Sequence, residues 1–125
     1  MATAVALRNI ESLAREHLIE KAAKTGDSLI ARLRRLEDHP NVGEVRGRGL
    51  LIGVELVEDK TARKFFEPAG KVAPAIVAAL LKRDVIARAM PQGDILGFAP
   101  PLCLNRDEAD IIGNAAKEAI IEVLG

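Results

Sequence analysis

Aromatic residues are scarce in this sequence of 125 residues, which contains no Trp, no Tyr and three Phe. Binding sites that stack the bases of single-stranded nucleic acid need several aromatic side chains, so this class of site is excluded. Basic and acidic side chains each number 18, so no net charge would attract nucleic acid or an anionic membrane. Leu, Ile, Val and Ala must therefore build the core of what is expected to be a single domain.

Cysteine is nearly absent as well: Cys103 stands alone, which excludes an internal disulfide and favours a reducing compartment. Together with His17 and His39 it does not form a zinc-like spacing, so we expect no metal site. No apolar run approaches the roughly 20 residues that span a bilayer. Charged residues also interrupt the N-terminal segment, unlike a signal peptide. A cytoplasmic protein without a membrane partner is expected.

Apolar residues recur every three or four positions from Ala2 to about Leu36, which predicts a helical segment. Gly26 lies inside it and is expected to mark a bend or a break between two helices. Residues 42–57 read as β-structure, because the even positions from 50 to 56 are all large aliphatics and predict one buried face. Two glycines in residues 46–49 indicate a bulge or a tight turn, at which both glycines are structural.

The second half of the sequence predicts a loop over residues 58–70, a helix with Pro74 in its first turn, a strand over 84–90 and a turn over 91–94. A strand over 95–98 and a final helix follow, the helix beginning with a capping box formed by Asn105 and Glu108. The order α-β-β-α-β-β-α predicts an α/β (α+β) fold. We expect a two-layer sandwich in which helices cover a small, mostly antiparallel sheet, in one domain spanning residues 1–125.

Arg88 is the candidate binding residue. It lies in an otherwise apolar segment next to a turn, where its guanidinium could bind a carboxylate through two hydrogen bonds. The alternative is an edge-strand arginine that points to water. No pair of carboxylates is spaced for acid–base catalysis.

Three stretches together resemble one family. They are residues 41–50 (NVGEVRGRGL), 52–56 (IGVEL) and 93–102 (GDILGFAPPL), the last followed by Asn105-Arg106-Asp107-Glu108 at the start of the final helix. The sequence resembles the C-terminal small domain of class III aminotransferases, the pyridoxal-phosphate enzymes that include the ω-transaminases and ornithine aminotransferase.

This resemblance implies that the cofactor lysine and the phosphate-binding loops belong to a large domain absent from these residues. No catalytic or cofactor-binding residue is then expected here, and whether the chain alone is an enzyme stays open, with an inactive isolated chain expected. Pyridoxal phosphate, an amino donor, a keto-acid acceptor and a homodimer are implied for the parent enzyme. Arg88 aligns with the substrate-carboxylate arginine of ω-transaminases. Gly97 stands where the ornithine aminotransferase branch has its arginine, which disfavours that branch.

Two other functions suit an α/β sandwich of this size. A free-standing regulatory module would bind a small ligand in a pocket of its own. A structural or oligomerisation domain would form a defined oligomer without any ligand.

Overall fold

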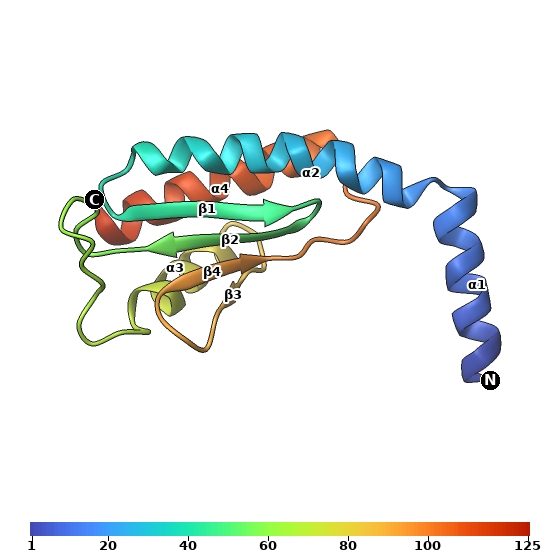
Figure 1. Ribbon diagram of the computed structural model, residues 1–125, viewed down its shortest axis with the longest axis horizontal. Coiled ribbons are helices and arrows are strands. Elements are labelled where there is room, and N and C mark those ends of the chain that lie inside the picture. Colours follow the sequence, from blue (N-terminus) through green and yellow to red (C-terminus); the bar gives the residue numbers. More distant parts are fainter.

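The computed structural model describes all residues, 1–125, and contains four α-helices, one 3-10 helix and four strands (Figure 1). The elements are, in chain order, α1 (Ala2–Arg15), α2 (Leu18–Arg34), η1 (Arg35–Asp38), β1 (Val42–Arg48), β2 (Leu51–Leu56), α3 (Val72–Leu81), β3 (Arg88–Ala89), β4 (Ile95–Phe98) and α4 (Arg106–Leu124). None of the helices has the length and apolar character needed to cross a membrane.

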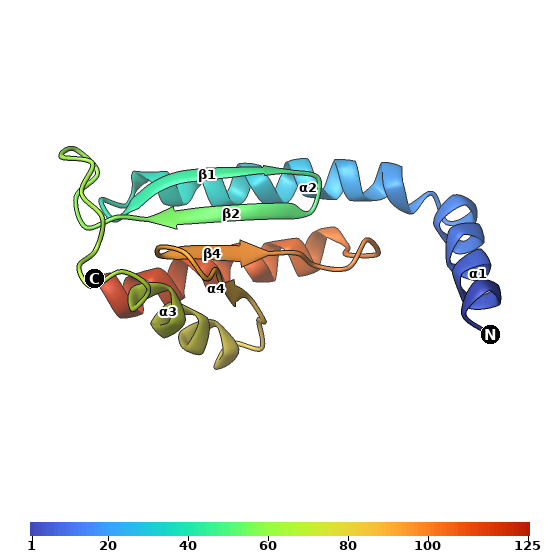
Figure 2. The ribbon, with the colours of Figure 1, turned by 60° about the horizontal axis from the view of Figure 1, so that its bottom comes forward.

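The sheet has the strand order β1-β2-β4-β3, and every neighbouring pair is antiparallel. Helices α2 and α3 both pack on α4, and the three helices cover one face of this sheet, as Figures 1 and 2 show from two sides. The opposite face of the sheet is open. The structure therefore confirms the predicted α+β fold of two layers with an antiparallel sheet.

The hairpin β1–β2 supplies much of the core. The even positions from 50 to 56, Leu50, Ile52, Val54 and Leu56, are all buried, whereas Leu51 is 72% exposed. Alternation of this kind is what a strand with one covered face requires. The predicted buried face of residues 50–56 is confirmed.

The helical break lies at His17 and not at Gly26, so the expected bend or break at Gly26 is wrong. His17 has a left-handed backbone (φ +51°) and separates α1 from α2. Gly26 is buried in the unbroken α2, where a Cβ atom would lie 2.2 Å from the carbonyl oxygen of Gly49. Glycine is needed there because α2 crosses the β1–β2 turn at backbone contact distance, a reason that lies far away in the sequence.

The β1–β2 turn explains the two glycines of residues 46–49. Gly49 has φ +57° in the two-residue turn between Arg48 and Leu51, where only glycine is free of strain. A Cβ on Gly47 would lie 2.5 Å from the carbonyl oxygen of Leu51. Of the two predicted alternatives, a bulge or a tight turn, the segment forms the tight turn. The irregularity in strand register lies earlier in the chain, between Val42 and Glu44.

The strand expected over residues 84–90 is reduced to Arg88–Ala89. Asp84 has φ +59°, outside the β region, and Ile86 is 87% exposed. The preceding residues have β propensity but no neighbouring strand to pair with, which is why they do not form a ladder. The final helix begins as predicted, because the Glu108 backbone N–H donates to Asn105 Oδ1 and the Asn105 N–H to Glu108 Oε2, both at 2.9 Å.

Candidate functional site

Arg88 lies on the edge strand β3, directly opposite Gly97 of β4. Its neighbour Ala89 pairs with the buried Leu96, so Ala89 faces the helices and Arg88 faces the open side of the sheet. The Arg88 side chain is exposed and forms no hydrogen bond or ion pair within the chain. Its guanidinium is therefore available to bind an anion from outside.

The register continues from Arg88 across the whole sheet. Gly97 pairs with Gly53 of β2, and Gly53 pairs with Arg46 of β1, so two glycines separate two arginines in one row. A Cβ on Gly53 would have no atom nearer than 3.8 Å, and one on Gly97 would lie 3.0 Å from Met90 Sδ. The two glycines thus contribute no side chains to the middle of the row, and the Met90 side chain lies over Gly97.

A shallow hollow of about 570 Å³ lies along the row from Arg46 to Gly97, lined also by Gly53, Met90 and Ile95 among others. Arg88 is next to this hollow in the row but does not line it. Arg46 at its far end forms ion pairs with Glu44 at 2.9 Å and Glu55 at 3.3 Å. The hydrogen bonds to Glu44 and Glu55 raise the pKa of Arg46 above its ordinary value. Arg46 is therefore neutralised within the chain, and Arg88 is the free cation of the row.

Asp94 anchors the β3–β4 hairpin that carries Arg88. Its carboxylate is buried and accepts hydrogen bonds at 2.8 Å from the backbone N–H groups of Gly70, Val72 and Ala73. Val72 and Ala73 open α3, so Asp94 satisfies donors that a helix N-terminus leaves unpaired. The sequence shows Asp94 only as a turn residue, because its partners lie more than 20 positions away.

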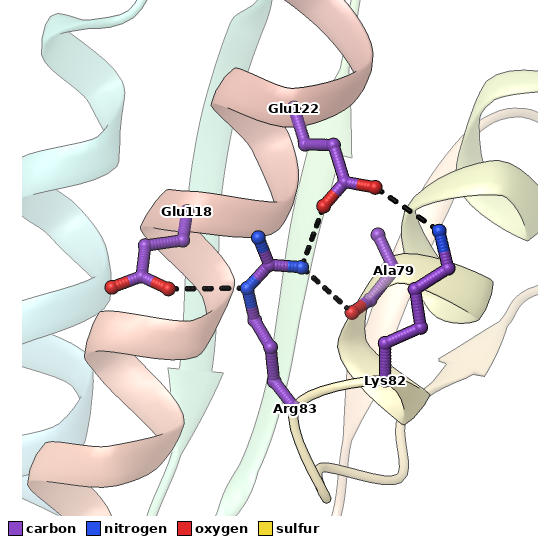
Figure 3. Close-up of polar contacts among 5 residues, drawn as sticks. All are labelled: Ala79, Lys82, Arg83, Glu118 and Glu122. Carbon is purple, nitrogen blue, oxygen red and sulfur yellow. Dashed lines mark hydrogen bonds and ion pairs between the residues drawn. The ribbon is translucent and has the colours of Figure 1, made fainter.

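The other end of α3 is held by Arg83, which is drawn in Figure 3. Arg83 donates from Nε to Glu118 at 3.1 Å and from Nη1 to Glu122 at 2.7 Å and to the Ala79 carbonyl at 2.9 Å. Lys82 adds an ion pair with Glu122 at 3.2 Å. These contacts raise the pKa of Arg83 and lower that of Glu122. They tie α3 to α4 directly before the segment that leads to β3.

A sequence model of the family described as aminotransferase class-III matches residues 1–120. The chain belongs to the class III aminotransferase family. It is 47% identical over 121 residues to a diaminobutyrate–2-oxoglutarate transaminase of Halomonas elongata, covering 96% of this chain and 26% of that protein. It is 36% identical over 121 residues to a putrescine–pyruvate aminotransferase of Pseudomonas aeruginosa, again covering 96% of this chain and 26% of that protein.

Solved structures of transaminases have the same fold. An (S)-enantioselective ω-transaminase from Thermomicrobium roseum superposes with a TM-score of 0.90 at 43% identity, over 98% of this chain and 27% of that chain. This chain thus spans about a quarter of the length of the aminotransferases that it matches. The resemblance inferred from residues 41–56 and 93–108 is confirmed.

The residues of this class III chain do not fit pyridoxal phosphate. A lysine that forms an imine with the cofactor needs a lowered pKa, a phosphate cradle and an acidic partner for the pyridine nitrogen. Lys64 has a pKa raised by its hydrogen bond to Glu58, which stabilises the unreactive ammonium form. Lys117 lines a hollow between α2, η1 and α4, and it is exposed. No group of His, Cys, Asp or Glu could hold a metal ion.

Proposed function

We propose that this chain forms the C-terminal small domain of a cytoplasmic, pyridoxal-phosphate-dependent aminotransferase of the ω-transaminase type. The parent enzyme transfers an amino group between an amine or amino acid and a keto acid. The family membership supports this proposal, and so does the length of the matched aminotransferases, about four times that of this chain. The remaining three quarters supply the cofactor lysine and the phosphate-binding loops. The regulatory-module and oligomerisation alternatives gain no support from the comparisons.

Within that enzyme, Arg88 binds the carboxylate of the substrate. The observation that carries this role is the pairing of Arg88 with Gly97, which leaves an unpaired guanidinium beside a position of the sheet that has no side chain of its own. A planar guanidinium can donate two parallel hydrogen bonds to a carboxylate. Arg46 does not compete for the substrate, because Glu44 and Glu55 already pair with it.

Replacing Arg88 by alanine in the full-length enzyme is expected to slow the reaction with amino-acid donors, because the transition state loses about 1.5–3 kcal/mol of binding free energy. The reaction with simple amine donors, which carry no carboxylate, should keep its rate. The measurement is the rate of the donor half-reaction in single-turnover experiments, so that the keto acid does not enter. Arg46→Ala, at the other end of the same row, is the matched control and should affect both donors alike. Equal losses for the two donors in Arg88→Ala would assign Arg88 a structural role.

We further propose that the parent enzyme is a homodimer and that the isolated chain self-associates through α1. This helix has no buried residue and extends away from the other helices (Figures 1 and 2). Its apolar side chains Val5, Leu7 and Ile10 are each more than half exposed. Pairing of two α1 helices about a two-fold axis would cover them. Sedimentation over a concentration series should show a monomer–dimer equilibrium that Leu7→Glu weakens; a strict monomer at millimolar concentration would contradict it.

A further inference from the structure

A second hollow, of about 560 Å³, lies in the helical layer between the C-terminal part of α2, η1 and α4. Arg32 and Arg35 line it from one side, Gly113 and Lys117 from the other. A Cβ on Gly113 would lie 3.4 Å from Arg32 Cβ, so the two helices approach each other closely here. This pocket belongs to the helical layer, whereas Arg88 lies on the open face of the sheet.

Unsatisfied polar atoms gather at this pocket. Two buried side-chain nitrogen atoms, Arg32 Nε and His39 Nε2, lack a partner. Asp110 Oδ1 has no hydrogen bond either, but it forms the ion pair with Arg32 Nη2. Arg32 and His39 line the pocket. Native proteins leave few such atoms without a partner, and a bound molecule is one of the ordinary reasons.

Most of the free polar groups of the pocket are donors. His39 Nδ1 accepts the backbone N–H of Asn41 at 3.2 Å, which leaves the ring proton of neutral His39 on Nε2. Arg35 and Lys117 form no ion pair. Asp38 is the one acid that lines the pocket. Arg32 is already paired with Asp110, so the positive charges of Arg35 and Lys117 and the negative charge of Asp38 leave a net charge of one positive unit. One negative charge on the ligand would balance it.

Part of the remaining wall is apolar. Leu36, Ile120 and Ile121 line the pocket, and Ile121 is 48% exposed. Leu36 and Ile120 are already buried, so a bare ion would leave only Ile121 in contact with water, whereas a ligand with a hydrocarbon part would cover it.

From these features we propose that the pocket binds a small organic monocarboxylate with an apolar body. The carboxylate accepts from His39 Nε2 and the guanidinium of Arg32 and pairs with Arg35 and Lys117. The hydrocarbon part covers Ile121. This site is independent of the proposed transaminase function.

The test is an NMR titration of the isotope-labelled 125-residue chain with hexanoate, with neutral hexanamide and with inorganic phosphate. Hexanoate should shift the His39 ring and Gly113 amide signals in a saturable manner, and hexanamide should bind at least ten-fold more weakly. The double variant Arg35→Gln/Lys117→Gln should weaken hexanoate binding about ten-fold, because each charge-assisted contact is lost. Arg34→Gln, at the same end of α2 but outside the pocket, is the matched control and should leave binding unchanged.

Four results would overturn the proposal. Hexanoate could fail to shift these signals up to high millimolar concentration. Hexanamide could bind as tightly as hexanoate, which would show that the pocket is an apolar groove without selectivity for anions. Arg34→Gln could weaken binding as much as the double variant does, which would show non-specific attraction to positive charge. Tighter binding of inorganic phosphate than of hexanoate would contradict the ligand class.

Discussion

Replacing Gly26 by alanine is expected to lower the free energy of unfolding by about 3 kcal/mol or more, although alanine is the better helix former by about 1 kcal/mol. The added Cβ would lie 2.2 Å from the carbonyl oxygen and 2.7 Å from the Cα of Gly49. These are backbone atoms of a tight turn and cannot turn aside as a flexible side chain would. Relief therefore requires α2 to move away from the β1–β2 hairpin, which opens the core. Urea denaturation followed by circular dichroism measures the loss.

Gly113→Ala is the matched control, since Gly113 is also inside a helix that packs on another element. Its Cβ would lie 3.4 Å from Arg32 Cβ, at the edge of ordinary van der Waals contact. We expect no loss there, or a gain of up to about 1 kcal/mol from helix propensity. Equal denaturation midpoints for the two variants would show that the approach of α2 to Gly49 is not tight.

Asp94→Ala should cost about 3–5 kcal/mol of folding free energy, because three backbone N–H groups lose a charged acceptor in a buried place. Asp94→Asn keeps one carbonyl oxygen and should cost less than Asp94→Ala. Hydrogen exchange at the amides of Val72 and Ala73 should accelerate in both variants, since these amides donate to Asp94. Thermal or urea unfolding gives the free energy, and exchange gives the location.

Asp107→Ala provides the comparison for Asp94. Asp107 also lies in the first turn of a helix, but it is exposed and accepts no hydrogen bond. Only its favourable interaction with the helix dipole is lost, about 0.3–1 kcal/mol. If Asp94→Ala cost no more than Asp107→Ala, the buried carboxylate would not be the anchor of the hairpin.

Features encoded by neighbouring residues could be predicted from the sequence. The capping box of Asn105 and Glu108 spans three residues, and the buried face of β2 follows from the alternation of its side chains. Gly26 could not be read correctly, because its reason is the Gly49 backbone more than 20 positions away. The length of β3 likewise depends on which strand lies beside it.

The candidate site shows the same limit. Arg88 was recognisable as a charged residue in an apolar segment, and its resemblance to a family arginine supported the prediction. Its position opposite Gly97, and the row that continues to Gly53 and Arg46, depend on strand order and register. Asp94 stood in a recognised motif, but its three partners come from another element, so its anchoring role could not be inferred.

We propose that this chain contributes substrate recognition to an aminotransferase but contains no site for the cofactor. Borohydride reduction of the isolated chain with a low excess of pyridoxal phosphate, followed by peptide mapping, tests it most directly. We expect only sub-stoichiometric adducts scattered over exposed lysines, and no transaminase activity. A stoichiometric adduct at one lysine, Lys117 included, would contradict the claim.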